Sequence, residues 1–184
     1  MIKSKEDLRA YINEDNNFLR PICVKAKIID IYTYTPMRLL RRYLSALRKM
    51  EYYLNTSHSN KFKKFLTLFY ERKKNRLGLR LGIEIGPNCF ERGLQLWHAG
   101  CIVVNPDARI GKNCILHGCN CIGNDGKSQK APTIGDNVEI GYGANVIGDI
   151  TIADNIVIGA NALVNKSFEE PGITIAGCPA RKIK

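Results

Sequence analysis

Glycine is absent from positions 1–77 of this 184-residue chain, although 16 glycines follow from Gly78 onward. The seven cysteines are an odd number without a CxxC pair, which disfavours a disulfide framework and a structural zinc site. No apolar run approaches the roughly 18 residues of a membrane-spanning helix, and the first residues form no apolar leader segment. These absences favour a globular protein with reduced thiols, which we expect to be cytoplasmic.

Positive charge is distributed as unevenly as glycine. The chain has a net charge of +11, and residues 1–80 hold 19 Lys or Arg against 7 Asp or Glu. Residues 81–184 hold 9 basic and 10 acidic residues and are close to neutral. We therefore expect a basic α-helical region at 1–80 and a second domain of different architecture at 81–184.

Helix signals are concentrated in the basic region. Ser4 and Asp7 form a capping-box pattern, which predicts a short first helix. Thr35 and Pro36 predict a second helix start, because the missing N–H of proline costs nothing at the first helical position. The apolar stripe of this second helix comprises Leu39, Leu40, Tyr43, Leu44, Leu47, Met50 and Leu54, whereas Arg41, Arg42, Arg48 and Lys49 fall elsewhere. A third helix is expected from Lys61 to about Leu77, with Phe62, Phe65, Leu66 and Phe69 on one face.

The second region repeats with a period of six residues. Ten of eleven positions spaced six apart are Val, Ile or Leu, and the residue after each is usually small. The eleven positions are Val104, Ile110, Leu116, Ile122, Ser128, Ile134, Ile140, Val146, Ile152, Ile158 and Val164. Ser128 lies in a polar stretch, 124–131, which we expect to leave the array as a loop.

A period of six fits neither an amphipathic helix nor a straight strand, whose periods are 3.6 and two. It fits a coil of short strands that turns a corner at each repeat and points one aliphatic residue into a narrow core. We therefore predict a mainly β fold, a left-handed parallel β-helix preceded by the helical region. Such flat-sided coils pack most readily as homotrimers, and hexapeptide-repeat proteins mostly use the clefts between chains for acyl transfer.

Acyl transfer needs a base, and the chain has three histidines. His58 lies in a polar linker between predicted helices and is most simply a solvated residue. His117 follows Leu116 at an outward position, from which it could reach a cleft or be an ordinary surface residue. His98 lies six residues before Val104, which would make it a core residue. The repeat fails in this segment, however, so we expect an altered turn to redirect His98.

Residues from about Leu81 to the C-terminus resemble the serine acetyltransferase family of hexapeptide transferases. The family's His-Ala-Thr-Gly-Ile-Val-Val motif is similar to residues 98–104, and its Gly-Gly-Thr-Gly-Lys loop is similar to residues 123–127. Its C-terminal Ala-Gly-Val-Pro-Ala-Arg motif is similar to residues 176–181. The resemblance covers a little over half of the chain and keeps the spacing between the first two motifs.

The resemblance implies that His98 is the base in an O-acetyl transfer with acetyl-CoA as co-substrate and no metal. It also implies that residues near Asn124, Tyr142 and Ala160 line the slot for CoA, and that Arg181 and Lys182 meet the CoA phosphates.

Three positions depart from the family pattern. Trp97 replaces the Asp that precedes the family histidine, and Ile83 occupies the place of a second supporting Asp. The acid partner of His98 would then be Glu84, a carboxylate of another chain, or absent. Lys130 and Ala131 replace an Arg-His pair that helps to hold serine, which weakens the case for an amino-acid acceptor. Trp97 would suit stacking on a sugar, and the short helical region resembles that of serine acetyltransferase-like chains associated with surface-polysaccharide synthesis. We therefore favour a sugar hydroxyl of a surface polysaccharide or its precursor over L-serine.

Other functions remain open. A non-catalytic trimeric scaffold is consistent with the missing aspartates. The charge of residues 1–80 suggests a nucleic-acid or anionic-membrane binder, but no nucleic-acid motif accompanies it, so peripheral membrane contact is the more reasonable reading. A metal-dependent hydrase would need more histidine ligands than His98 and His117 provide. Trimers pairing into hexamers through the helical regions remain an alternative to a single trimer.

Overall fold

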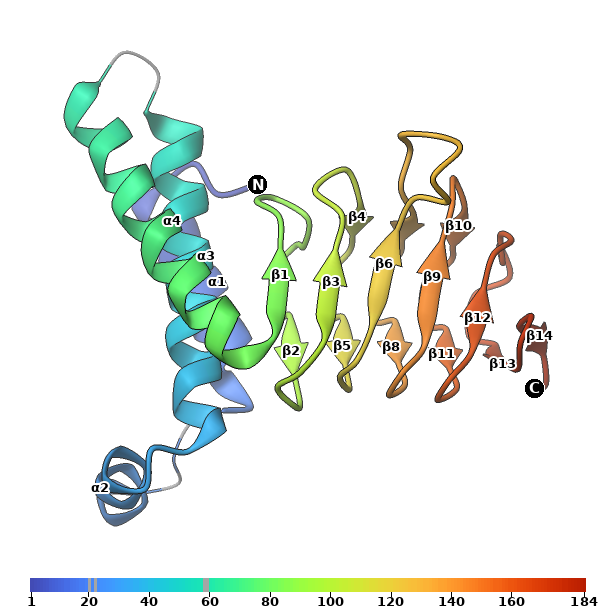
Figure 1. The fold of residues 1–184 in the computed structure, drawn as a ribbon, viewed down its shortest axis with the longest axis horizontal. Coiled ribbons are helices and arrows are strands. Elements are labelled where there is room, and N and C mark those ends of the chain that lie inside the picture. Colours follow the sequence, from blue (N-terminus) through green and yellow to red (C-terminus); the bar gives the residue numbers. More distant parts are fainter. Residues whose placement is uncertain (20, 22, 58–59) are drawn as a thin grey trace. The chain divides into compact units, whose positions relative to one another are not determined.

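The chain divides into two compact units, Met1–Gly82 and Ile83–Lys184. This computed structural model describes residues 1–19, 21, 23–57 and 60–184, so His58 lies outside the described residues. The first unit is helical, and the second consists of short, mostly parallel strands (Figure 1). None of the helices in the described part of the chain combines the length and the apolarity needed to cross a membrane.

The helical unit contains α1 (Lys5–Asn17), α2 (Val24–Tyr32), α3 (Pro36–Thr56) and α4 (Lys61–Leu81). The predicted capping box is confirmed: the Asp7 N–H donates to the Ser4 hydroxyl and the Ser4 N–H donates to the Asp7 carboxylate, each at 2.9 Å. Thr35 caps α3 and Pro36 opens its first turn, as expected. Helix α2 was not predicted from the sequence.

Helix α4 is longer than predicted. It continues through Gly78 to Leu81 and ends where Gly82 adopts a left-handed conformation, with φ 67° and ψ 39°. Glycine reaches this conformation without the Cβ clash that other residues suffer, which makes it a common helix terminator. The expected end at Leu77 was therefore four residues too early.

The core of the helical unit lies along α3, which packs against α1 and α4. Tyr43, Leu44 and Leu47 are fully buried, whereas Leu54 at the end of the predicted stripe is exposed. Arg48 corrects the prediction, since it was expected off the buried stripe but is fully buried. Its charge is neutralised locally, because it is paired with two carboxylates.

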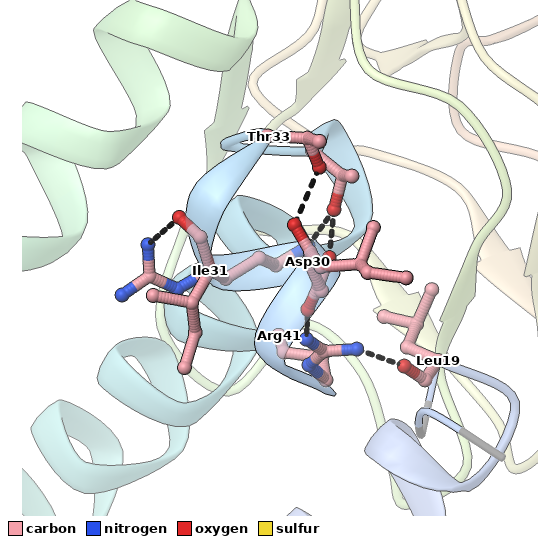
Figure 2. A network of polar contacts seen from close by, with 8 residues as sticks. Leu19, Asp30, Ile31, Thr33 and Arg41 are labelled. Carbon is pink, nitrogen blue, oxygen red and sulfur yellow. Dashed lines mark hydrogen bonds and ion pairs between the residues drawn. The ribbon is translucent and has the colours of Figure 1, made fainter. Parts of the chain in front are cut away.

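At the α2–α3 junction, polar contacts hold the chain together (Figure 2). The Asp30 carboxylate accepts hydrogen bonds from the Thr35 hydroxyl and from the Arg41 guanidinium, which also donates to the carbonyl of Leu19. The Thr33 hydroxyl donates back to the carbonyl of Ile29 at 2.7 Å and closes the end of α2. Because Asp30 is buried while most apolar side chains of α2 are exposed, this helix is attached mainly by polar contacts.

The second unit is a parallel β-helix with three faces (Figure 1). One face carries β1 (Ile83–Ile85), β3 (Ile102–Val104), β6 (Cys121–Gly123), β9 (Asn145–Ile147) and β12 (Leu163–Val164). The second carries β4 (Arg109–Ile110), β7 (Thr133–Ile134) and β10 (Thr151–Ile152). The third carries β2 (Gln95–Leu96), β5 (Ile115–Leu116), β8 (Glu139–Ile140), β11 (Val157–Ile158), β13 (Thr174–Ala176) and the antiparallel β14 (Arg181–Lys182).

The six-residue period is confirmed as the core of this unit. All ten aliphatic positions that define it are at most 3% exposed. Strand partners on successive turns, such as Asn145 and Leu163, are three periods apart in the sequence. Partners that flank the polar stretch at 124–131, such as Cys121 and Asn145, are four periods apart, because this stretch leaves the array as a loop. The loop thus adds one whole period, which is why the repeat continues in phase beyond it.

Candidate active site

The turn after β2 is two residues longer than the corresponding turn after β5. Val103 pairs with Cys121 at a distance of three periods along the sequence, whereas Leu96 pairs with Leu116 at three periods plus two residues. The Trp97 N–H donates to the carbonyl of Leu116 at 3.0 Å, and the ladder resumes where the Cys119 N–H donates to the carbonyl of Gly100 at 3.1 Å. Residues 98 and 99 are therefore the two extra residues of this turn.

His98 is one of these extra residues, and its side chain is exposed. The insertion explains why counting by six fails here and why His98 does not enter the core. Gly118 lies directly against this turn: a Cβ placed on Gly118 would be 3.4 Å from the Cβ of His98 and 3.1 Å from the ring of Tyr142. The glycine thus allows an exposed imidazole and an exposed phenol to approach the same point of the surface.

No hydrogen bond or ion pair joins Glu84 to His98 within the described residues of this chain. Glu84 lies on the exposed side of β1, in register with Val103. Within the described residues neither the Glu84 side chain nor the His98 side chain forms a hydrogen bond or an ion pair. The predicted pairing of Glu84 with His98 therefore has no hydrogen bond or ion pair to support it. The acid partner of His98 would then be a carboxylate of another chain, or absent.

His117 has the acid partner that His98 lacks. Its Nε2 lies 2.8 Å from Oε1 of Glu139, and the Trp97 ring packs on the imidazole with the ring centroids 4.4 Å apart. The indole N–H of Trp97 donates to the side chain of Gln95 at 3.4 Å. Trp97 is thus a packing partner of His117, and one of its faces is already occupied.

Glu139 was not among the residues predicted for the site. Glu139 pairs with Ile115, so it is the diagonal neighbour of His117 on the outer side of the same sheet. The sequence contained a signal for this contact, because His117 and Glu139 are 22 residues apart. Equivalent positions on these two turns are four periods, or 24 residues, apart, and residues two apart in a strand lie on the same side of it. The signal becomes visible only when the loop at 124–131 is known to add one period.

Tyr142 and Ala160, both predicted to line the CoA slot, lie one above the other. Ile140 pairs with Ile158, so Tyr142 and Ala160 follow at equivalent positions of successive turns, and both are exposed. The Cys119 thiol donates to the Tyr142 hydroxyl at 3.0 Å. This hydrogen bond and the adjacent sulfur raise the pKa of Tyr142, so the phenol is protonated at neutral pH. Asn124, the third residue predicted to line the CoA slot, is not stacked with Tyr142 and Ala160. It is half-buried and directly follows the last residue of β6.

The loop at 124–131 is ordered by its own polar groups. The Asp125 carboxylate accepts the N–H groups of Ser128 and Lys127 at 3.0 and 2.9 Å, and these bonds lower the pKa of Asp125. Lys130, a predicted substrate contact, instead reaches Asp149 with an Nζ to Oδ2 distance of 2.7 Å. That exposed ion pair raises the pKa of Lys130, and a substrate carboxylate would have to compete with Asp149 for this cation.

The two predicted phosphate contacts lie in β14 and are both exposed. Lys182 Nζ is 2.7 Å from each carboxylate oxygen of Glu170, so its charge is already paired. The side chain of Arg181 forms no hydrogen bond or ion pair with any described residue, so its guanidinium is available. Across the described ranges, no group of three His, Cys, Asp or Glu side chains is arranged to hold a metal ion.

Comparison with known proteins identifies serine acetyltransferases among the relatives of this chain. No family model matches the chain. A serine acetyltransferase of Staphylococcus xylosus is 39% identical over 106 residues, which are 56% of this chain and 49% of that protein. A serine acetyltransferase of Helicobacter pylori is 29% identical over 162 residues, 86% of each protein. The chain thus spans about half the length of the first relative and most of the second.

Solved structures extend the likeness to the helical unit. Soybean serine acetyltransferase complexed with serine has a TM-score of 0.72 and 25% identity, covering 97% of this chain and 70% of that one. Serine acetyltransferase of Brucella abortus in complex with coenzyme A has a TM-score of 0.66 and 24% identity, covering 97% and 66%. The predicted left-handed β-helix of hexapeptide repeats is thereby confirmed as the fold.

Proposed function

We propose that the chain is a hexapeptide-repeat acetyltransferase of the serine acetyltransferase type, which transfers the acetyl group of acetyl-CoA to a hydroxyl acceptor. The observation that carries the proposal is the insertion of His98. The insertion brings the exposed His98 imidazole close to Tyr142. Tyr142 and Ala160 occupy equivalent exposed positions on successive turns, so the three residues form a column along one edge of the β-helix. An exposed imidazole of this kind is a common general base in enzyme active sites.

In the proposed reaction His98 removes the proton of the acceptor hydroxyl. The alkoxide oxygen attacks the thioester carbonyl, and a C–O bond forms as the carbonyl oxygen becomes an oxyanion. Collapse of this intermediate breaks the C–S bond, and the imidazolium returns the proton to the CoA sulfur. The Tyr142 hydroxyl, kept protonated by its raised pKa, is a hydrogen-bond donor at the same surface and can stabilise the developing negative charge.

Acetyl-CoA acts here as a co-substrate. The stacked turns that present Tyr142 and Ala160 form an elongated surface, which is suited to a long molecule such as CoA. Ala160 offers an exposed methyl group in register with Tyr142, and Arg181 is available for a phosphate. The structural neighbour from Brucella abortus was solved in complex with coenzyme A. We propose homotrimers as the active form, since a neighbouring chain would supply the second wall of the cleft and a carboxylate for His98.

Two acceptors are supported by different observations. L-Serine is favoured by the names of the relatives, and the soybean structure contains serine. A sugar hydroxyl, proposed because of Trp97 and Lys130, gains no support from these relatives. It rests on one point: Lys130, the cation that replaces the family arginine, is paired with Asp149, and this pair would have to break before Lys130 bound a serine carboxylate.

A direct test is acceptor-dependent release of CoA from acetyl-CoA by the purified chain, with L-serine in one arm and oligosaccharides and nucleotide sugars in the other. Turnover with either acceptor class supports the acetyltransferase, and the class that turns over identifies the acceptor. Tight binding of acetyl-CoA without transfer to any hydroxyl would contradict the catalytic proposal and favour the scaffold alternative.

A further inference from the structure

Helix α4 has an outer face that no described part of the helical unit covers. Five large apolar side chains on it are 51–87% exposed: Phe62, Phe65, Leu68, Phe69 and Leu79. The first four recur at three- and four-residue spacing, so they lie on one side of the helix. The opposite side is already satisfied, because Leu77 and Leu81 are buried and Tyr70 stacks on Tyr53 of α3, with ring centroids 5.6 Å apart.

The same outer face is strongly basic. Lys61, Lys64, Arg72, Arg76 and Arg80 are exposed between the apolar residues, and Glu71 is the acid among them. A cleft of about 490 Å³ opens beside them, between α4 and α3. Its lining includes Arg42, Arg72, Lys73, Arg76, Arg80 and Phe69, and it includes no carboxylate of a described residue. Cations that converge on one cleft without an acid repel one another, so they favour an anionic occupant.

We propose that the outer face of α4 docks on an anionic lipid bilayer. Aromatic and aliphatic side chains interleaved with cations on one side of a helix are typical of helices that lie in the membrane interface. The phenylalanines and leucines would enter the acyl boundary, and the arginines of the cleft would bind lipid phosphates. Helix α4 rises by about 30 Å over its 21 residues, enough to contact several headgroups at once.

A lipid surface fits this face better than a macromolecule does. A two-fold contact with a second copy of the chain would bring the same set of cations into contact with itself, which is unfavourable without intervening anions. A nucleic acid would neutralise the cations and could stack on the phenylalanines, but Leu68 and Leu79 have no ring to stack. The bilayer alone matches both halves of the surface, the charged groups and the aliphatic ones.

The test is co-sedimentation of the full chain with vesicles of phosphatidylcholine alone and of phosphatidylcholine containing phosphatidylglycerol. We expect binding to the anionic vesicles and little to the neutral ones. The double variant Arg72→Gln/Arg76→Gln should bind about tenfold or more weakly, because each basic residue near the surface contributes substantially to attraction. The matched control Lys5→Gln/Arg9→Gln removes the same charge from exposed positions of α1 and should bind as the wild type does.

The apolar part of the surface needs its own variant. Phe62→Gln/Phe65→Gln should still bind anionic vesicles at low salt but lose binding when salt is raised, because only screened attraction is left. Replacing the exposed Ile183 by Gln controls for loss of an apolar side chain elsewhere. Circular dichroism checks that every variant keeps its helix content.

Three results would overturn the proposal. The first is absence of binding to anionic vesicles. The second is tighter binding of single-stranded RNA than of the vesicles. The third is a drop in molecular mass of the Arg72→Gln/Arg76→Gln variant with unchanged vesicle binding, which would make the face a contact between copies.

Discussion

Arg48 is a fully buried cation held between two carboxylates. Its Nε donates to Asp15 at 2.7 Å and its Nη1 donates to Glu51 at 3.0 Å, while its guanidinium lies 4.9 Å from the centre of the Tyr11 ring. Burial alone would lower the pKa of Arg48, but Glu51 and Asp15 more than offset it and hold the pKa above its ordinary value. The charge therefore persists inside the helical unit, and its partners must be kept.

We predict that Asp15→Asn destabilises the helical unit by about 3–5 kcal/mol, because it leaves a buried guanidinium with one carboxylate fewer. Urea unfolding followed by helix circular dichroism measures this change. The control Glu71→Gln removes an exposed carboxylate and should shift the free energy of unfolding by less than about 0.5 kcal/mol. Equal effects of the two substitutions would show that the buried cluster has no special role.

Cysteine reactivity gives a second prediction for single residues. Burial raises the pKa of Cys114 to about 12, so at pH 8 only about 1 in 10,000 of its thiols is ionised. Iodoacetamide should therefore modify the exposed Cys23, Cys101 and Cys178 rapidly and leave Cys114 intact until the chain unfolds. Peptide mass mapping reads the result, and early modification of Cys114 in folded protein would contradict the packing of the β-helix.

Single residues also show how far the sequence could be interpreted. The failure of the six-residue repeat indicated that His98 was redirected, and the structure supplies the reason, a two-residue insertion. The bond between His117 and Glu139 was not foreseen, because it depends on the length of a loop between them. The burial of Arg48 was not foreseen either, because the carboxylate of Asp15 is 33 residues away and local periodicity cannot report it.

Among the elements, the corners of the β-helix contain a ladder of asparagines. The amide of Asn113 donates to Asn137 at 2.9 Å, and the amide of Asn137 donates to Asn155 at 3.1 Å. All three residues have positive φ angles between 56° and 59°. Asparagine tolerates this conformation better than most residues, and here its side chain also links successive turns.

We predict that Asn137→Ala destabilises the β-helix by roughly 1–3 kcal/mol, because alanine is strained at positive φ and both ladder bonds are lost. Asn137→Gly loses the same bonds without the strain and should recover about 1 kcal/mol of the difference. Thermal unfolding of the two variants separates the contributions. Identical stability of both would exclude backbone strain as a cause.

Elements with a strong period were predictable and the others were not. The hexapeptide period identified the β-helix because every repeat buries an aliphatic residue at the same place. Helix α2 was missed because its apolar side chains do not form a buried face: Val24, Ile28 and Tyr32 are 62–91% exposed. In α4 the phenylalanines were correctly placed on one face, but periodicity cannot tell which face of a helix meets the core.

At the scale of the whole molecule, charge and chemistry are separated along the chain. The positive charge lies in residues 1–80, and the docking surface proposed for α4 belongs to that region. The close-to-neutral β-helix carries the candidate active site. This division predicts that α4 variants which abolish vesicle binding leave acetyl transfer to a small acceptor unchanged in solution. Parallel loss of both properties in Arg72→Gln/Arg76→Gln would show that the functions are linked.

The most direct test of the account is the rate at which His98→Ala consumes acetyl-CoA with a hydroxyl acceptor, followed by loss of the thioester ultraviolet absorbance. If His98 is the base, kcat falls at least about 100-fold while the KM for acetyl-CoA changes little, because a general base contributes to the transition state rather than to binding. Full activity in His98→Ala would contradict the assignment of His98 as the base. So would a loss of activity that occurs in His117→Ala and not in His98→Ala.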